Sequence, residues 1–219
     1  MGGRGLDGNE RSFYCSGVTK GEDTRHVILG EALALASEVG VTGISIGALA
    51  ERVGMSKSGL FAHFASKDNL AVAILEEASR RVVEEVVAPA LKARRGEPRV
   101  RALFDRWIAW AGGGLPGGCI FMAATVELDD RPGPARDRLV ASQRDWLATL
   151  SQAVRIAIEE GHFRRDVDAE QLAFELYAIG HGYHTLTRLL RDATAEKRAR
   201  QAFEHVLAAA RTSVSPVPR

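Results

Sequence analysis

Cysteine is scarce in this sequence, which has two among its 219 residues, Cys15 and Cys119. They lie far apart and form no C-x-x-C pair, which excludes a disulfide framework and a zinc ribbon. Buried free cysteine is common in proteins, so we interpret Cys119 as a small core residue. A thiol sensor at Cys119 is the alternative, because placement beside a mobile glycine loop would permit it.

Long apolar runs are absent as well. Glu84 and Glu85 interrupt the apolar stretch 82–91, which is far below the roughly 18–20 residues that a membrane-spanning helix needs. Residues 1–23 hold six glycines and no apolar segment of the secretory kind. We therefore expect a cytoplasmic protein without a membrane partner.

An excess of charge of either sign is also missing. The chain has 29 Lys and Arg against 28 Asp and Glu, a formal net charge of +1. Residues 1–70 hold seven basic and eight acidic residues, so the N-terminal part has no basic surplus either. Bulk electrostatics cannot hold a polyanion here, and any nucleic-acid binding must rest on a local arrangement of residues.

Apolar residues recur at helical spacing along most of the chain, and no strand pattern competes with them. The pattern predicts an all-α protein with about nine helices. The first follows a cap at Thr24 and ends at Gly40, and the second follows a cap at Ser45 and ends at Gly54. The remaining predicted helices span 57–64, 67–87, 99–111, 119–128, 135–160, 169–190 and 195–212. The glycine run 112–118 is expected to be a mobile loop.

Two of the predicted helices are short and are joined by a turn at Gly54 and Met55, which is the sequence form of a helix-turn-helix. In that motif the second helix lies in the DNA major groove, with small or polar residues outward and apolar residues behind. Leu60 and Phe64 lie four residues apart and should pack inward. Free N–H groups at the starts of the helices offer further sites for phosphates.

The stretch 45–70 reads SIGALAERVGMSKSGLFAHFASKDNL, with the pattern S-K-x-x-L-F-x-H-F-x-S-K-x-x-L inside it. It closely resembles the tetracycline-repressor-like (TetR) family of transcriptional regulators. The resemblance implies DNA contacts or supporting roles at five positions, and three neighbours at the start of the second helix complete the candidate set. The set is Ser45, Ser56, Lys57, Ser58, Gly59, Phe61, His63 and Lys67.

The chain departs from the family pattern at two places. Many members carry Gly-Thr where this chain has Ser58-Gly59, and Tyr where it has Phe61. Phe61 offers only apolar contact, for instance with a thymine methyl.

The resemblance also implies a division of the chain. It assigns 24–70 to the DNA-binding domain and 71–214 to a domain that binds an effector and dimerises, while residues 1–23, whose charges cancel, are expected from their composition to form a disordered tail. The last two helices occupy the position of the family's dimerisation pair, so a homodimer would bind an inverted-repeat operator in double-stranded DNA. The interface candidates are Leu172, Leu176, Ile179, Tyr183, Leu186, Phe203, Val206 and Leu207.

Aromatic residues are sparse, at 6% of the chain, and most of them follow Leu70. A helical bundle that contains such rings can enclose an apolar cavity, although any single ring more often fills the core. Taken with the resemblance, they predict a site for a small, largely apolar effector. Its expected lining is Trp107, Phe121, Met122, Trp146, Phe174, Tyr177 and His181.

A small helical-bundle enzyme is the competing interpretation. His181 and His184 lie three apart on one predicted helix, a spacing that lets two imidazoles face one metal, but no acidic or thiol ligand accompanies them. Glu127, Asp129 and Asp130 precede a Pro-Gly-Pro turn and fit a solvated loop better than acid–base catalysis. The glycine run lacks the phosphate-binding form G-x-x-x-x-G-K-[ST]. We therefore expect a ligand-responsive repressor with no catalytic site, metal or cofactor.

Overall fold

The computed structural model describes residues 20–212. Within this range the chain is helical, with no strand and a single isolated bridge between Phe163 and Arg211. Where consecutive segments run on without a break they form one helix, and the described part then has nine helices, as the sequence pattern predicted. In the same part, no helix has the length and apolar character that crossing a bilayer demands.

The first helices are α1 (Lys20–Val39), α2 (Ile46–Arg52) and α3 (Lys57–Phe64). Next, α4 (Lys67–Val82) continues through the π-helical segment η1 (Val83–Val87) into α5 (Ala88–Leu91), and α6 (Glu97–Ala109) continues into the π-helical segment η2 (Trp110–Gly114). The remaining helices are α7 (Ile120–Leu128), α8 (Pro134–Glu159), α9 (Ala169–Arg188) and α10 (Ala195–Ala210).

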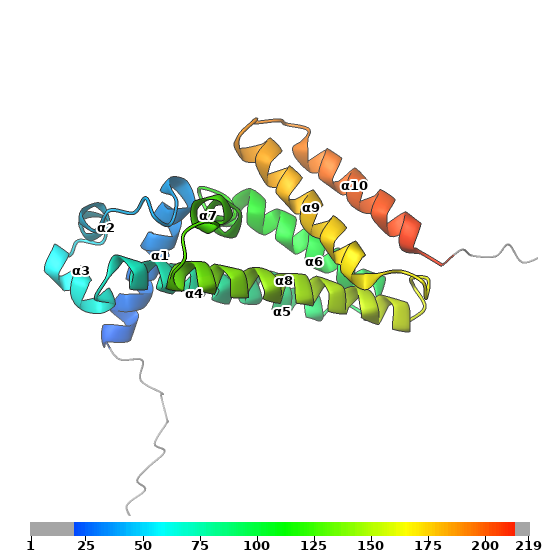
Figure 1. The fold of residues 1–219 in the computed structure, drawn as a ribbon, viewed down its shortest axis with the longest axis horizontal. Helices are drawn as coiled ribbons and strands as arrows, with labels where there is room; N and C mark the ends of the chain where they lie inside the picture. The colour runs from blue at the N-terminus through cyan, green and yellow to red at the C-terminus, as the bar shows by residue number, and fades with distance from the viewer. Residues whose placement is uncertain (1–19, 213–219) are drawn as a thin grey trace, which may run out of the picture.

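The molecule is elongated, with α2 and α3 at one end (Figure 1). Helices α4 and α8 pack along each other, and α9 packs between α8 and α10. Helix α7 contacts both α1 and α8, so it lies where the N-terminal helices meet the larger bundle. The core is a continuous set of buried apolar side chains that extends from α1 to α10.

The helix ends follow the expected local chemistry. The hydroxyls of Ser45, Ser56 and Ser66 accept from backbone N–H groups three residues ahead, at 3.4, 3.1 and 3.0 Å. Asp168 accepts from the N–H groups of Glu170 and Gln171 at the start of α9. These contacts satisfy N–H groups that have no partner inside the helix, which is why each helix begins there.

The first helix begins earlier than predicted. Helix α1 starts at Lys20, so Thr24 lies inside it and is not its cap. Residues 20–23, which were predicted to belong to the tail, are therefore part of α1, and residues 1–19, with Cys15, lie outside the described range. The predicted domain boundary at residue 70 falls within α4, which is continuous there.

The glycine run is not the open loop that its composition suggested. Gly112 to Gly114 continue α6 as η2, and Leu115, Gly117 and Gly118 are buried. The Gly117 N–H donates to the Ser37 hydroxyl at 2.8 Å, in a buried contact with α1. A Cβ on Gly117 would lie 1.6 Å from the Ser37 carbonyl oxygen, so the absence of a side chain allows the two backbones to meet.

Candidate DNA-binding face and ligand cavity

Helix α3 has one buried face and one open face. Leu60 and Phe64 are buried at 0% and 5% exposure, as their spacing predicted. Lys57, Ser58 and Phe61 are exposed on the other side, with 49% of Phe61 accessible. An exposed ring of this size on a short helix is available for apolar contact with a partner surface.

The start of α3 is locally ordered by hydroxyl contacts. The Ser56 hydroxyl accepts from Gly59 N–H at 3.1 Å and lies 3.2 Å from the Ser58 hydroxyl. A Cβ on Gly59 would lie 3.1 Å from the Ser56 oxygen, which is tighter than ordinary contact. Gly59 therefore leaves room for the Ser56 hydroxyl at the start of α3.

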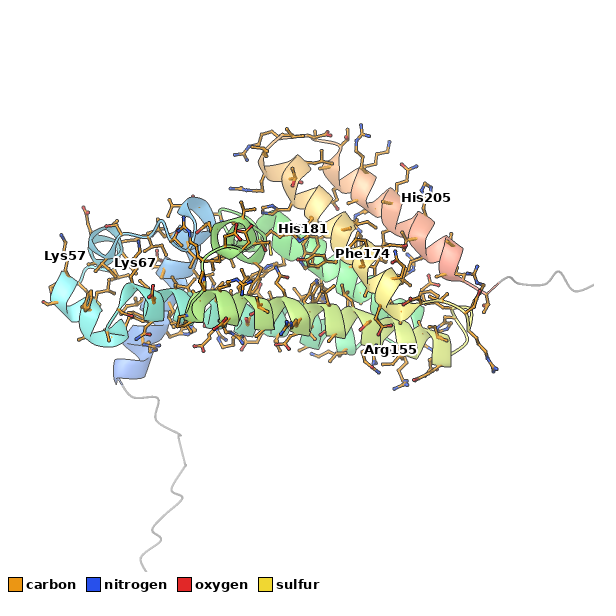
Figure 2. The ribbon with its side chains drawn as sticks, viewed as in Figure 1. Lys57, Lys67, Arg155, Phe174, His181 and His205 are labelled. Carbon is orange, nitrogen blue, oxygen red and sulfur yellow. The ribbon has the colours of Figure 1, made fainter. Side chains whose placement is uncertain are left out.

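Lys57 belongs to the surface shared by α2 and α3. Its side chain passes the start of α2, where a Cβ on Gly47 would lie 3.0 Å from the Lys57 Cε and 3.4 Å from its Nζ. Ser45 caps the same end of α2. Figure 2 shows Lys57 at the end of the molecule formed by α2 and α3. One ammonium and two helix N-termini therefore lie close together, which favours an anionic partner.

Lys67 and His63 have structural contacts of their own. The Lys67 ammonium donates to the Thr42 carbonyl at 2.6 Å and so ties the start of α4 to the turn after α1. His63 is half-buried, and its carbonyl accepts from Arg25 at 2.8 Å. The Arg25 guanidinium lies 4.7 Å from the centre of the Phe64 ring. These contacts hold α3 and α4 in place against α1.

A cavity of about 130 Å³ lies between α4, α6, α7, α8 and α9. Its wall is mainly apolar and includes six aromatic side chains. The lining consists of Ser79, Val82, Val83, Val87, Phe104, Trp107, Trp110, Cys119, Phe121, Met122, Ser142, Gln143, Asp145, Trp146, Thr149, Leu150, Leu176, Tyr177 and Gly180. Such a lining suits a small, largely apolar ligand.

The two π-helical segments both reach this cavity. Val83 and Val87 of η1 and Trp110 of η2 line it. A π-helical turn shifts the following side chains relative to an α-helix and often occurs at functional sites. Gly180 of α9 contributes in another way, since a Cβ there would lie 3.0 Å from the Trp107 ring. The ring therefore fits against bare backbone.

Five of the seven predicted lining residues are at the cavity, namely Trp107, Phe121, Met122, Trp146 and Tyr177. Phe174 is not, because it lies on the outward face of α9 and is 59% exposed. His181 is outside the lining too, although its ring lies 4.5 Å from the Tyr177 ring, and burial lowers the pKa of His181. The labelled side chains in Figure 2 place both residues on α9.

The cavity also holds residues that the sequence prediction did not include. Trp110 is one of the aromatic residues that follow Leu70, but the helical pattern did not predict that its side chain lines the cavity. The hydroxyls of Ser79 and Ser142 lie 3.0 Å apart and join α4 to α8. Asp145 of α8 carries the single carboxylate of the lining.

Cys119 is buried at 3% exposure, which disfavours the thiol-sensor alternative. Burial raises the pKa of the Cys119 thiol, with hydrogen bonds from neighbouring groups acting against it. A thiol in this position stays protonated at neutral pH and reacts slowly with oxidants. Burial raises the pKa of Tyr177 in the same cavity.

Helix α7 connects the cavity to the N-terminal helices. Its Phe121 and Met122 line the cavity, whereas Glu127, near its C-terminal end, faces the turn after α1. The Glu127 carboxylate accepts from the Thr42 N–H at 2.9 Å and from the Thr42 hydroxyl at 3.1 Å. Gly40 faces the same carboxylate, since a Cβ there would lie 2.0 Å from it. Glu127 thus has a structural role.

The predicted interface residues divide into two groups. Leu172, Leu176, Tyr183, Phe203 and Leu207 are buried inside this chain, at 5% exposure or less, so they are core residues rather than surface for a partner. Ile179, Leu186 and Val206 are half-buried. Helices α9 and α10 pack on each other, and α9 also packs on α8, so these buried residues lie between helices of one chain.

Two family models match the sequence. One, described as "Bacterial regulatory proteins, tetR family", covers residues 28–74, and the other, "Tetracyclin repressor-like, C-terminal domain", covers residues 96–203. The chain belongs to the TetR family. It is a transcriptional regulator with a helix-turn-helix DNA-binding region, α2 to α3, and a helical C-terminal part. No curated protein matches it.

Solved structures of TetR regulators share the fold. One from Chloroflexus aurantiacus is 29% identical, with a TM-score of 0.79 over 89% of this chain and 99% of that one. A TetR-family regulator from Cytophaga hutchinsonii is 19% identical, with a TM-score of 0.79 over 90% and 99%. AibR, solved with isovaleryl coenzyme A and operator DNA, is 23% identical, with a TM-score of 0.67 over 81% and 95%.

The acids and histidines considered for catalysis or metal binding have other surroundings. Asp129 accepts from the Asp130 N–H at 2.9 Å within its own turn. Burial lowers the pKa of His184, and its neighbours Arg188 and His181 act in the same direction. Within residues 20–212, no three His, Cys, Asp or Glu side chains gather as metal ligands would.

Proposed function

We propose that this TetR regulator is a dimeric repressor that binds an inverted-repeat operator through α3 and releases it when a small, largely apolar effector enters the cavity. The position of α7 carries this proposal. Its Phe121 and Met122 form part of the cavity wall, and its Glu127 holds Thr42 beside the DNA-binding helices. A ligand that moves α7 therefore moves the turn to which α2 is attached.

The coupling requires that the effector bind the two arrangements of the helices with different affinity, since equal affinity shifts nothing. The Gly117 contact with Ser37 gives α7 a second attachment to α1, from the other end of the helix. The AibR structure, solved with isovaleryl coenzyme A and operator DNA, is an example of a small molecule and operator DNA bound to one protein of this fold. These features support effector-controlled DNA release.

For DNA recognition we assign roles by exposure. Lys57, Ser58 and Phe61 reach outward from α3 and contact the major groove, while the capped N-termini near Ser45 and Ser56 bind phosphates. Lys67 acts at the backbone from the start of α4. Gly59 and His63 support the helix.

Dimerisation through α9 and α10 is part of the proposal. The outward side of α9 exposes Phe174 at 59%, and Leu189 and Leu190, just after the end of the helix, are exposed at 76% and 61%. Large exposed apolar residues on one surface are typical of an interface between copies. The two reading helices would then lie about 34–36 Å apart, or a multiple of that, across an inverted repeat.

Selection of bound DNA from a random pool tests the function directly. We expect the full chain to enrich an inverted repeat, and mass measurement in solution to give a dimer. A pool that stays random after repeated selection, or a stable monomer on the selected DNA, would refute the proposal.

A further inference from the structure

The cavity has an unusual balance of charge, which bears on the kind of effector that it takes. Its lining contains no Lys, Arg or His, and Asp145 is its single carboxylate. The raised pKa values of Cys119 and Tyr177 keep both of those groups neutral at pH 7. An anionic ligand would find no positive partner there and would lie near a negative charge.

Asp145 is available to a ligand. It lies on the exposed side of α8, and within residues 20–212 it makes no ion pair. The Thr149 hydroxyl bonds to the backbone carbonyl of Asp145, which leaves the carboxylate unengaged by that contact. The next residue, Trp146, is half-buried and lines the same cavity. A carboxylate and an indole of α8 therefore both belong to the cavity lining.

The aromatic residues of the lining also favour a cationic ligand. Trp107, Trp110 and Trp146 are the three tryptophans of the chain, and all of them line the cavity together with two phenylalanines and Tyr177. Aromatic faces attract cations, tryptophan most strongly, and aromatic cages bind quaternary ammonium groups. An unpaired carboxylate beside such rings adds a Coulombic attraction for the same charge.

We propose that the effector is a compact lipophilic cation, with an apolar body inside the cavity and a substituted ammonium group at Asp145 and Trp146. This rests on the proposed function in taking the cavity as the effector site. The cavity, at about 130 Å³, is close in size to a cavity of roughly 150 Å³ in another protein that holds benzene, so an apolar body of about one aromatic ring matches it. Acyl thioesters of the kind bound to AibR carry phosphates and fall outside this class.

The test measures binding to the full chain without DNA, by tryptophan fluorescence, because all three indoles report on the cavity. The probes are phenyltrimethylammonium, its neutral isostere tert-butylbenzene, and benzoate. We expect Asp145→Asn to weaken phenyltrimethylammonium about threefold to tenfold and to leave tert-butylbenzene within about twofold. Asp137→Asn, the same change on the same helix but outside the lining, should leave all three affinities unchanged.

Three results would overturn the inference: no saturable binding of phenyltrimethylammonium, binding that Asp145→Asn does not weaken, or benzoate binding as tightly as the cation. Operator release is measured separately with the selected DNA. If the cation binds as expected but leaves the operator bound, the effector-release proposal fails and the cation site stands. If a neutral compound releases the operator and the cation does not bind, the cation site fails and the effector-release proposal stands.

Discussion

The contact between Gly117 and Ser37 should be among the least tolerant places in the chain. Gly117→Ala would put a Cβ 1.6 Å from the Ser37 carbonyl oxygen and 2.6 Å from the Glu38 nitrogen. Both atoms belong to the backbone of α1, so neither can swing away as the end of a side chain can. Separating the segments also breaks the buried bond from the Gly117 N–H to the Ser37 hydroxyl. Overpacking typically costs about 1–3 kcal/mol and the net hydrogen bond about 1 kcal/mol.

We therefore expect Gly117→Ala to lower the free energy of unfolding by about 2–4 kcal/mol, or Tm by about 5–10 °C for a chain of this size. Urea and thermal unfolding followed by circular dichroism measure it. Gly113→Ala is the matched control, because that glycine lies in the same run, has no positive φ, and has no other atom within 4 Å of the point where its Cβ would lie. A helix gains about 0.4–1 kcal/mol from such a change, so stability should hold or rise. Equal losses in the two variants would refute the reasoning.

Three further predictions concern separate parts of the chain. Lys57→Ala should weaken operator binding about tenfold with an unchanged far-UV spectrum, while Lys197→Ala on the exposed side of α10 should not; equal affinities in a gel-shift assay would argue against α3 as the reading helix. In a Cys15→Ser background, Cys119 should react with Ellman's reagent far more slowly in buffer than in urea, and a fast native reaction would restore the thiol sensor. Arg211 lowers the pKa of Glu97 to about 2, so this carboxylate stabilises the fold above pH 4.5 and the contribution is lost as pH falls toward 2. Glu97→Gln should then lower the free energy of unfolding by about 1–2 kcal/mol at pH 7, as measured by urea titration. The difference between the two proteins should narrow below pH 4.5, and it would be absent at every pH if the pair with Arg211 did not form.

The features that the sequence predicted well depend on near neighbours in the chain. Ser56 caps α3 through a residue three positions ahead, and Leu60 and Phe64 share a face because they are four apart. The pattern S-K-x-x-L-F-x-H-F therefore specified both the helix and its buried side before any tertiary contact was known. Thr24 failed as a cap because a polar residue inside a helix has the same local appearance as one before it.

The cavity was predicted less well, because it depends on which face of each helix turns inward. Helix α9 is apolar on more than one side, with Leu172 and Leu176 buried and Phe174 exposed between them. Periodicity does not distinguish the core face of such a helix from a face that awaits another partner. Asp145 was missed for another reason, since an exposed acid on a long amphipathic helix ordinarily contacts solvent alone.

The long-range contacts of α7 had no sequence signal at all. Glu127 and Thr42 are 85 positions apart, and neither is unusual in its local context. Yet the Thr42 carbonyl also accepts from the Lys67 ammonium, so Glu127, Thr42 and Lys67 form a continuous polar chain from α7 to the start of α4. In a chain with a net charge of +1, each ammonium near the DNA contributes a large share of the attraction. In the proposed mechanism, movement of α7 would therefore change DNA affinity in two ways, through the position of α2 and through the position of the Lys67 ammonium.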